Sequence, residues 1–317
     1  MTRQSRTLVL LAIAAVGMAG CVPSEERATD GVQAATSAVL VTSDGTELPY
    51  LIEGDGIPCV VVGDPFTPAK ALSEELRRHI RFIFMRSREN IPSESLGETD
   101  DVTLETFLDD IEELRASLDL DEICVFGHSI YGLYALAYAR RYPHHTSHVI
   151  MHATPPGGDA AIQQQMANDY WESQASEARK EVLRENWESR PDTLEPDPIC
   201  SWCLEYVTNG PKYWYDSTYD AAWLLEGWYR YSNPTDVGDL LFDLLEQYDV
   251  DAGDELTVPV FLALGKFDFV VPYISWNERG TKLPNLTIHL FEKSGHWSML
   301  EEQILFDETL IEWIHGR

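Results

Sequence analysis

The sequence contains few of the residues on which several classes of protein depend. Its five cysteines are too few for a scaffold built from disulfides, so folding has to rest on apolar burial. Basic residues are scarce as well: 23 lysines and arginines stand against 53 acidic residues, and the formal charge of -30 would repel nucleic acid. Apolar residues make up 44% of the 317 positions, which excludes intrinsic disorder and allows one or two cores.

The first twenty residues have the pattern of an export signal. Arg3 and Arg6 precede an apolar run at 8–16, which is shorter than the roughly 20 residues that a membrane-spanning helix needs. Small residues lead to Cys21, and the segment resembles a bacterial lipoprotein signal, although Met18 stands where leucine is usual. The resemblance implies that Cys21 is lipidated and that the protein is exported and anchored to a bacterial membrane, facing the periplasm or the exterior. A plain secretory signal cut nearby is the alternative.

The signal at 1–20 and a polar tether at 21–37 precede a region in which strands and helices alternate. Apolar runs at 38–42 and 48–52 flank Asp44-Gly45, which predicts a hairpin, and Pro49 predicts that the second strand lies at a sheet edge. We expect further strands at 59–62, 81–85, 123–126, 149–152, 258–264 and 286–291. Helices are expected over Leu72, Leu76 and Ile80 and at 103–118, 133–142 and 302–314. This order predicts an α/β fold, with a mostly parallel sheet covered by helices on both faces.

Residues 155–255 differ in composition from the core segments at 38–154 and 256–317. They hold six of the nine tryptophans and eight of the fourteen tyrosines, with few β-branched runs. We interpret the region as an inserted helical cap. Its rings either form the core of the cap or face a cleft against the sheet, where pockets commonly form.

Three residues in different parts of the chain have the chemistry of a nucleophile, a base and an acid. Ser129 follows a buried strand in Gly127-His128-Ser129-Ile130-Tyr131-Gly132 and precedes a helix, while Asp268 and His296 each follow a later strand. Because the carboxyl ends of parallel strands meet at one sheet edge, we expect the three side chains to converge there. A serine hydroxyl needs such a base, oriented by an acid, to act as a nucleophile.

The order of these residues and the glycine-flanked turn resemble the α/β-hydrolase superfamily from about residue 38 to 316. The Gly-His-Ser turn, the mid-chain cap and the segment 265–272 are most similar to its proline iminopeptidase-like branch. The resemblance implies that Ser129 is the nucleophile, His296 the general base and then acid, and Asp268 the residue that orients the imidazole. No cofactor is implied.

The sequence departs from the superfamily pattern at two places. Tyr131 stands two residues after the serine, where glycine is usual, so its ring must point out of the turn or reshape the pocket. The oxyanion hole needs two backbone N–H donors, of which Ile130 is one. The second should follow the strand at 59–62, but Pro65 has no N–H, which leaves Phe66 as the donor, with Asp64 or a shifted alignment as alternatives.

The resemblance points first to an aminopeptidase that removes N-terminal proline from short peptides, with a carboxylesterase as the alternative. Removal of N-terminal proline from short peptides would use acidic cap residues to bind the free amine, for which Glu172 and Glu226 are the candidates, with Glu188 and Glu205 also near cap aromatics. Tyr131 and Trp297 are further candidate substrate contacts. A carboxylesterase would use the same triad without an amine-binding carboxylate, and a binding protein without catalysis is a third interpretation. A short-peptide or small-molecule substrate and a membrane are the expected partners.

The remaining cysteines and histidines predict no metal site. Cys200 and Cys203 are spaced for a small local disulfide, and no second ligand pair accompanies them. Cys59 and Cys124 lie in apolar strands and are expected in the core. The group His144, His145 and His148 lacks a metallopeptidase motif, so we assign it to a surface loop.

Overall fold

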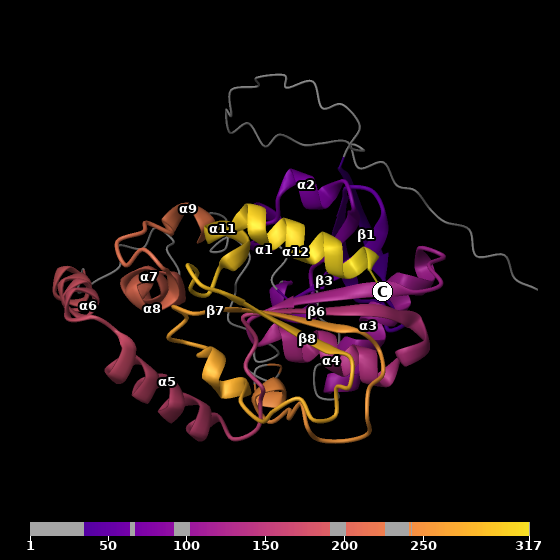
Figure 1. Cartoon of the computed structure of the whole chain (residues 1–317). Helices are drawn as coiled ribbons and strands as arrows, with labels where there is room; N and C mark the ends of the chain where they lie inside the picture. Colours follow the sequence, from indigo (N-terminus) through magenta and orange to yellow (C-terminus); the bar gives the residue numbers. More distant parts are fainter. Residues whose placement is uncertain are drawn as a thin grey trace, which may run out of the picture. The chain divides into compact units, whose positions relative to one another are not determined.

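A computed structural model describes residues 35–63, 67–91, 102–190, 201–225, 241 and 243–316. It contains an eight-stranded sheet in the order β1-β2-β4-β3-β5-β6-β7-β8 (Figure 1). The β1–β2 and β2–β4 pairs are antiparallel, and the other five pairs are parallel. The strands are β1 Thr36–Val41, β2 Glu47–Glu53, β3 Ile57–Val62, β4 Ile80–Met85, β5 Ile123–His128, β6 Thr146–His152, β7 Val260–Gly265 and β8 Leu286–Phe291.

The helices cover both faces of this sheet, as the sequence predicts. Val60 and Val62 face the core shared with α3 Leu104–Ser117 and α4 Tyr131–Arg141. Cys59 and Val61 point to the opposite face, which packs on α1 Thr67–Ala71, α2 Glu74–Arg77, α11 Ser298–Glu301 and α12 Gln303–His315. The alternation follows from the two-residue period of a strand, and the apolar run of β3 is explained by burial on both faces.

The hairpin β1–β2 forms as predicted, but its second strand is not at an edge. β2 lies between β1 and β4, and the expectation from Pro49 is therefore wrong. The pairing of β2 with β4 begins at Tyr50 and Met85, one residue after Pro49. At that point the Pro49 carbonyl accepts a bond of 2.9 Å from Arg86, and no ladder residue of β4 faces the missing N–H.

One predicted helix is divided, and one histidine of a predicted loop lies in a strand. Ser73 adopts an extended conformation and caps α2 through Leu76 N–H, so the helix expected over Leu72, Leu76 and Ile80 splits into α1 and α2, and Ile80 begins β4. The last helix, predicted at 302–314, is confirmed as α12, and the short helix α11 precedes it. His148 was expected in a surface loop, but β6 begins at Thr146 and His148 lies within it, beside Trp313. His144 and His145 belong to the short helix η3 Pro143–His145.

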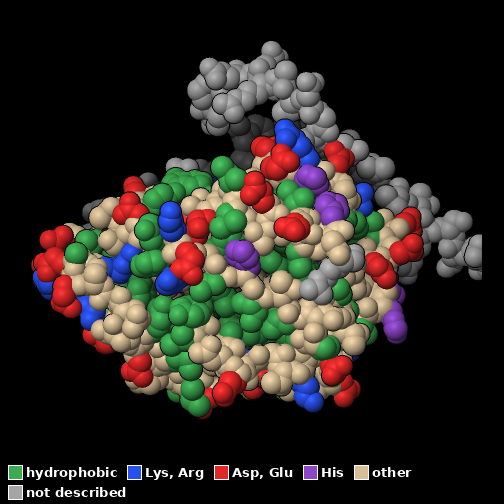
Figure 2. Space-filling view, viewed as in Figure 1, with side chains coloured by type: hydrophobic (Ala, Val, Ile, Leu, Met, Phe, Trp, Pro, Cys, Tyr) green, Lys and Arg blue, Asp and Glu red, His purple; other side chains and the backbone are tan. Residues whose placement is uncertain are grey.

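The described part of the chain between β6 and β7 contains helices joined by turns and irregular segments. Figure 1 draws its helices beyond the end of the sheet at which β7 finishes. They are α5 Ala160–Gln174, α6 Glu177–Ser189, α7 Ser201–Thr208, α8 Gly210–Tyr213 and α9 Ala222–Leu225. Acidic side chains are spread around the face seen in Figure 2, in keeping with the excess of acid in the sequence.

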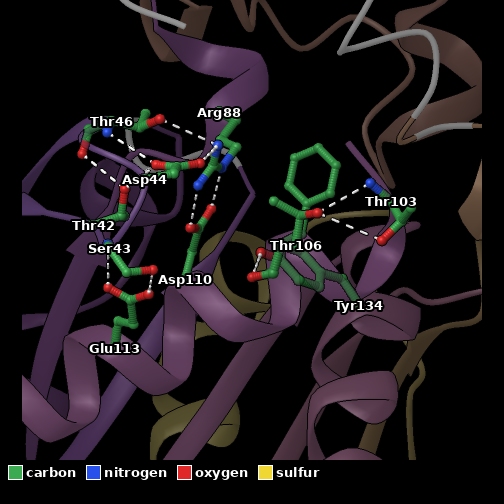
Figure 3. A network of polar contacts seen from close by, with 11 residues as sticks. Thr42, Ser43, Asp44, Thr46, Arg88, Thr103, Thr106, Asp110, Glu113 and Tyr134 are labelled. Carbon is green, nitrogen blue, oxygen red and sulfur yellow. Dashed lines mark hydrogen bonds and ion pairs between the residues drawn. The ribbon is translucent and has the colours of Figure 1, made fainter. Parts of the chain in front are cut away.

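A buried ion-pair network holds the segment that follows β4. Arg88, in η1 Arg88–Asn90, donates two hydrogen bonds of 2.7 and 2.8 Å to Asp110 on α3 and one of 2.7 Å to Asp44 in the β1–β2 turn (Figure 3). The side chain of Asn90 in turn donates to the carbonyl of Gly63, at 3.0 Å. The network therefore fixes the backbone at the end of β3, where the predicted oxyanion loop begins.

Candidate active site

The predicted nucleophile lies in a sharp turn between β5 and α4. Ser129 has a φ of 56°, in the left-handed region that residues other than glycine rarely adopt, and its N–H donates to the His152 carbonyl at 2.7 Å. A Cβ at Gly127 would overlap the Tyr131 carbonyl, and one at Gly132 would overlap the Thr154 side chain. The two glycines thus allow the chain to pass from strand to helix within two residues, which raises Ser129 above the end of β5.

The predicted acid is fully buried after β7 and is held in one orientation. The Oδ1 atom of Asp268 accepts hydrogen bonds from the N–H groups of Val270 and Val271 at 2.9 and 2.8 Å. Its Oδ2 atom lies 2.6 Å from Nδ1 of His296. The structure therefore brings two of the three predicted residues together, and the Asp268 contact with Nδ1 leaves Nε2 of His296 as the other nitrogen for proton transfer.

The loop that carries His296 is fixed through its backbone. The His296 N–H donates to the Tyr213 carbonyl at 2.6 Å, and the Gly295 N–H donates to Glu301 at 2.7 Å. Ser294 donates through its hydroxyl to Glu302 at 2.8 Å. The base is thus positioned both by α11 and the residue after it, and by the chain between β6 and β7.

Ser129 and His296 lie at the same edge of the sheet without a direct hydrogen bond. The ring of His128, the residue before Ser129, is 4.8 Å from the His296 ring in an edge-to-face arrangement. Among the hydrogen bonds of the described residues, none joins the Ser129 hydroxyl to the His296 ring. Such a bond is often long without substrate and tightens when substrate binds.

Two histidines, His128 partly buried and His152 fully buried, support this edge, and neither was predicted from the sequence to do so. Nδ1 of His128 lies 2.8 Å from Nδ1 of His152, and Nε2 of His152 lies 2.8 Å from the Ser298 hydroxyl. Burial and the neighbouring His296 lower the pKa of His152 to about 3, and burial followed by His296 and His152 lowers the pKa of His128 well below its usual value. Both rings are therefore neutral at pH 7. The signal for His152 is its place at the end of a strand beside the serine strand.

One predicted oxyanion donor is placed, and the other is not described. Ile130 immediately precedes α4, where the N–H groups of the first turn have no partner within the helix. Asp64, Pro65 and Phe66 lie outside the described residues. The ring of Tyr131 covers Gly63, where an added Cβ would overlap it. The bulky residue that departs from the superfamily pattern is thus packed over the end of β3.

The tentative substrate-binding residues fall in different environments. Tyr131 and Trp297 are 8% and 3% exposed, and the Trp297 indole packs 3.9 Å from the His128 ring and donates to the Tyr206 hydroxyl. Glu172 is exposed on α5 and pairs with Lys180 at 2.9 Å. Glu188 is exposed on α6, whereas Glu226 and the side chain of Glu205 lie outside the described residues, as do Cys21, Cys200 and the side chain of Cys203.

Arg179 on α6 connects the cap helices with the acid loop. Its guanidinium is 8% exposed and donates to the carbonyls of Pro211 and Trp214, both at 2.7 Å, and to that of Tyr215. It also lies 5.7 and 5.4 Å from the ring centroids of Phe267 and Phe269, which flank Asp268. The sequence offered no signal for this residue, because its role depends on how the cap helices pack.

A cleft of about 170 Å³ opens beside the acid and base loops. Tyr213 lines it and also packs its ring 5.5 Å from that of His296; Val270, which donates to Asp268, lines it as well. The described lining residues are Gln164, Ala167, Asn168, Asn209, Lys212, Tyr213, Phe269 and Val270. The cleft is therefore separated from Asp268 and His296 by residues that contact them, Val270 and Tyr213.

The expected core cysteines are buried, and no metal centre is present in the described part of the chain. Cys59 and Cys124 are fully buried free thiols that face each other on β3 and β5. No group of three or more histidine, cysteine, aspartate or glutamate side chains there could hold a metal ion. His145 instead forms an ion-pair contact of 2.9 Å with Glu112.

Comparison with known proteins gives a family and several relatives. The family model of the alpha/beta hydrolase fold matches residues 69–303. The AB hydrolase superfamily protein YclE of Bacillus subtilis is 28% identical over 274 residues, which cover 86% of this chain and 96% of that protein. A proline iminopeptidase of Lactobacillus delbrueckii subsp. bulgaricus is 23% identical over 235 residues, which cover 67% of this chain and 72% of the relative.

Solved structures share the fold at lower sequence identity. An esterase from Thermogutta terrifontis aligns with a TM-score of 0.58 and 20% identity, over 89% of this chain and 98% of that one. A proline iminopeptidase-related protein from Thermus thermophilus aligns with a TM-score of 0.62 and 18% identity, also over 89% and 98%. At these identities the similarity establishes the fold alone.

Proposed function

Because the chain belongs to the alpha/beta hydrolase family, we propose that it is a serine hydrolase that cleaves an ester or amide bond of a small substrate. The observation that carries the proposal is the 2.6 Å contact between the buried Asp268 and His296, at the sheet edge where Ser129 occupies a left-handed turn. Asp268 fixes the tautomer in which His296 carries its proton on Nδ1. Nε2 is then free to accept a proton.

The reaction follows from these roles. His296 removes the proton from the Ser129 hydroxyl as its oxygen attacks the substrate carbonyl, and the Ile130 N–H donates to the developing oxyanion. The protonated imidazole then gives its proton to the leaving alcohol or amine, which leaves an acyl group on Ser129. A water molecule, deprotonated by His296, hydrolyses that ester and restores the serine. The neutral state of His128 and His152 favours the imidazolium, because neither ring places a second positive charge beside it.

Ester hydrolysis is the substrate preference that the site supports first. The amine-binding carboxylates required by an aminopeptidase are not among the described residues of the cleft, and Glu172 is turned to solvent beside Lys180. Proline iminopeptidase activity is the second candidate, favoured by the relatives that carry that name. A binding protein without catalysis stays the third.

Covalent labelling tests the serine mechanism. A fluorophosphonate probe should label the purified protein, and Ser129→Ala should abolish the labelling. Ser173→Ala removes another hydroxyl, on exposed α5, and should label normally. An unlabelled wild-type protein would remove the serine hydrolase proposal. Hydrolysis of p-nitrophenyl acetate and butyrate, compared with proline-β-naphthylamide, then separates the esterase from the aminopeptidase.

We also propose that the chain is exported and lipid-anchored through Cys21, on the basis of the N-terminal pattern alone. Residues 1–34 lie outside the described residues, and in the part that is described no helix is long and apolar enough to cross a membrane. Radiolabelled palmitate should be incorporated into the wild-type protein and not into Cys21→Ser. Equal incorporation in both would contradict the anchor.

A further inference from the structure

The cleft beside the acid and base loops has a polar end with one charged group. It lies between α5, α8 and the residues that follow Asp268. Among the described residues that line it, Lys212 alone carries a charge, and that charge is positive. In a chain with 53 acidic and 23 basic residues, a cleft wall with a lysine and without a carboxylate is not the expected outcome of composition.

Lys212 is half-buried and has no carboxylate bound to its ammonium group within the described parts of the chain. The ammonium lies 5.5 Å from the centroid of the Trp171 ring. Glu172 attracts it, but the Glu172 carboxylate is bound by Lys180 at 2.9 Å. Burial lowers the pKa of Lys212, because a partly desolvated ammonium is less stable when charged. A bound anion would compensate for this loss of hydration.

Two asparagines, Asn168 and Asn209, line the cleft together with Lys212. The Asn168 side-chain oxygen accepts a hydrogen bond from Gln164 at 3.2 Å, and that of Asn209 accepts one from the Trp187 indole at 3.1 Å. Their NH₂ groups make no hydrogen bond to other described residues. Asn168, Asn209 and Lys212 line the same cleft, and amide and ammonium N–H groups are donors from which a carboxylate accepts hydrogen bonds.

We propose that this cleft is a subsite for an anionic group of the substrate, and that the enzyme favours small esters that carry a free carboxylate. The inference rests on the proposed serine hydrolase function. Tyr213 lines the cleft and packs against His296, and Val270 lines it and donates to Asp268. The proposal therefore places one end of a short substrate in the cleft and its ester at Ser129. The ammonium group of a peptide N-terminus would be repelled by Lys212.

Matched pairs of esters test the subsite. Monomethyl succinate, glutarate and adipate each carry one carboxylate, and the corresponding dimethyl esters are neutral, so proton release measures both series with the same leaving group. We expect the wild-type enzyme to favour at least one monoester over its diester. Lys212→Met should lower kcat/KM for that monoester by about tenfold, mainly through KM, and should change the diester by less than about twofold.

Two further variants serve as controls. Arg184→Met removes an exposed cation of the cap that pairs with Glu181, and it should leave the monoester preference unchanged. Lys212→Arg keeps the charge and should retain most of the preference. Equal kcat/KM for monoester and diester in the wild type, or an unchanged preference in Lys212→Met, would overturn the inference while leaving the serine hydrolase function intact.

Binding gives a readout that needs no turnover. Titration calorimetry with adipate, glutarate and succinate should detect binding of at least one dicarboxylate to the wild-type protein, weakened about tenfold in Lys212→Met. If binding shows this dependence but neither ester series is hydrolysed, the proposed hydrolase function fails and the anion subsite stands. Absence of dicarboxylate binding to the wild type would contradict the subsite directly.

Discussion

The backbone N–H of His296 donates a hydrogen bond of 2.6 Å to the carbonyl of Tyr213, a residue of the chain between β6 and β7. The neighbouring Lys212 carbonyl accepts a bond of 3.0 Å from Phe269, which follows Asp268. One short segment of the cap region is thus bonded to the loop of the base and to the loop of the acid. The inserted region therefore helps to hold the catalytic geometry, in addition to its place beside the cleft.

Replacing Asp268 by asparagine should remove activity without disturbing the fold. Because Val270 and Val271 hold Oδ1 of Asp268, the new NH₂ group has to occupy the position that faces Nδ1 of His296. Nδ1 must then accept a hydrogen bond, so the proton moves to Nε2, where the base is needed. We expect kcat to fall about 10³- to 10⁴-fold, measured on the best p-nitrophenyl ester. Near-normal turnover with an unchanged circular dichroism spectrum would assign the acid to another residue.

The contact between Tyr131 and Gly63 predicts an interaction that a double-mutant cycle can measure. Gly63→Ala places a Cβ against the ring and strains a φ of +83°, and should cost about 2 kcal/mol of unfolding free energy. Tyr131→Ala removes a buried ring and should cost about 3 kcal/mol. In the Tyr131→Ala background, Gly63→Ala should cost less by about 1 kcal/mol, because only the backbone strain remains. Strictly additive costs in urea unfolding would contradict the contact.

The residues that the sequence could predict are those whose position depends on local order along the chain. Ser129, Asp268 and His296 each follow a strand, and a parallel sheet collects such strand ends at one edge, so only the alternation of strands and helices had to be correct. That rule brings Asp268 and His296 to the same edge, and the loops that hold each residue then set the 2.6 Å contact between them.

Features that depend on contacts between distant segments could not be predicted in the same way. Pro49 has no N–H to donate, and this predicted an edge strand. The prediction was wrong because the ladder between β2 and β4 begins only at Tyr50, which the sequence does not reveal. Arg179 and Lys212 lie in helices of unremarkable composition. Their roles depend on the carbonyls, rings and cleft that helix packing places next to them. The amphipathic period of a helix identifies a buried face, not the partner that covers it.

The carboxylate of Glu301 should make stability depend on pH near neutrality. Burial raises the pKa of Glu301 from 4.5 to about 7, against the hydrogen bonds that it accepts from Gly295 and Tyr215. A carboxyl with a raised folded-state pKa contributes stability that is full below about 4.5 and is lost as pH rises through about 7.

The variant Glu301→Gln cannot ionise, and it should therefore gain stability relative to the wild type as pH rises. Between pH 4.5 and 8 the unfolding free energy of the variant minus that of the wild type should rise by up to about 3 kcal/mol. This is the free energy that corresponds to a pKa change from 4.5 to about 7. Urea unfolding of both proteins at several pH values measures it. A constant offset across that range, caused only by a lost hydrogen bond, would refute the titration of Glu301.

Arg179 should act on catalysis through the segment that it holds. Its guanidinium bonds to the carbonyls of Pro211, Trp214 and Tyr215, so Arg179→Met leaves these acceptors without a donor in a buried place. We expect a loss of about 3 kcal/mol in unfolding free energy. Because the same segment bonds to His296 and Phe269, kcat should fall about tenfold while the protein is still folded at 20 °C.

The neighbouring residue Arg184 provides the control for this prediction. It lies on the same helix, is exposed, and pairs with Glu181 one turn away, so Arg184→Met removes the same charge and length of side chain. Its unfolding free energy should stay within about 0.5 kcal/mol of the wild type, and kcat should not change. Arg179→Lys keeps the charge but cannot reach three carbonyls from one planar group, and should resemble Arg179→Met in kcat. If Arg179→Met lost stability but kept the wild-type kcat below its melting temperature, Arg179 would support the cap alone and not the orientation of the acid and base.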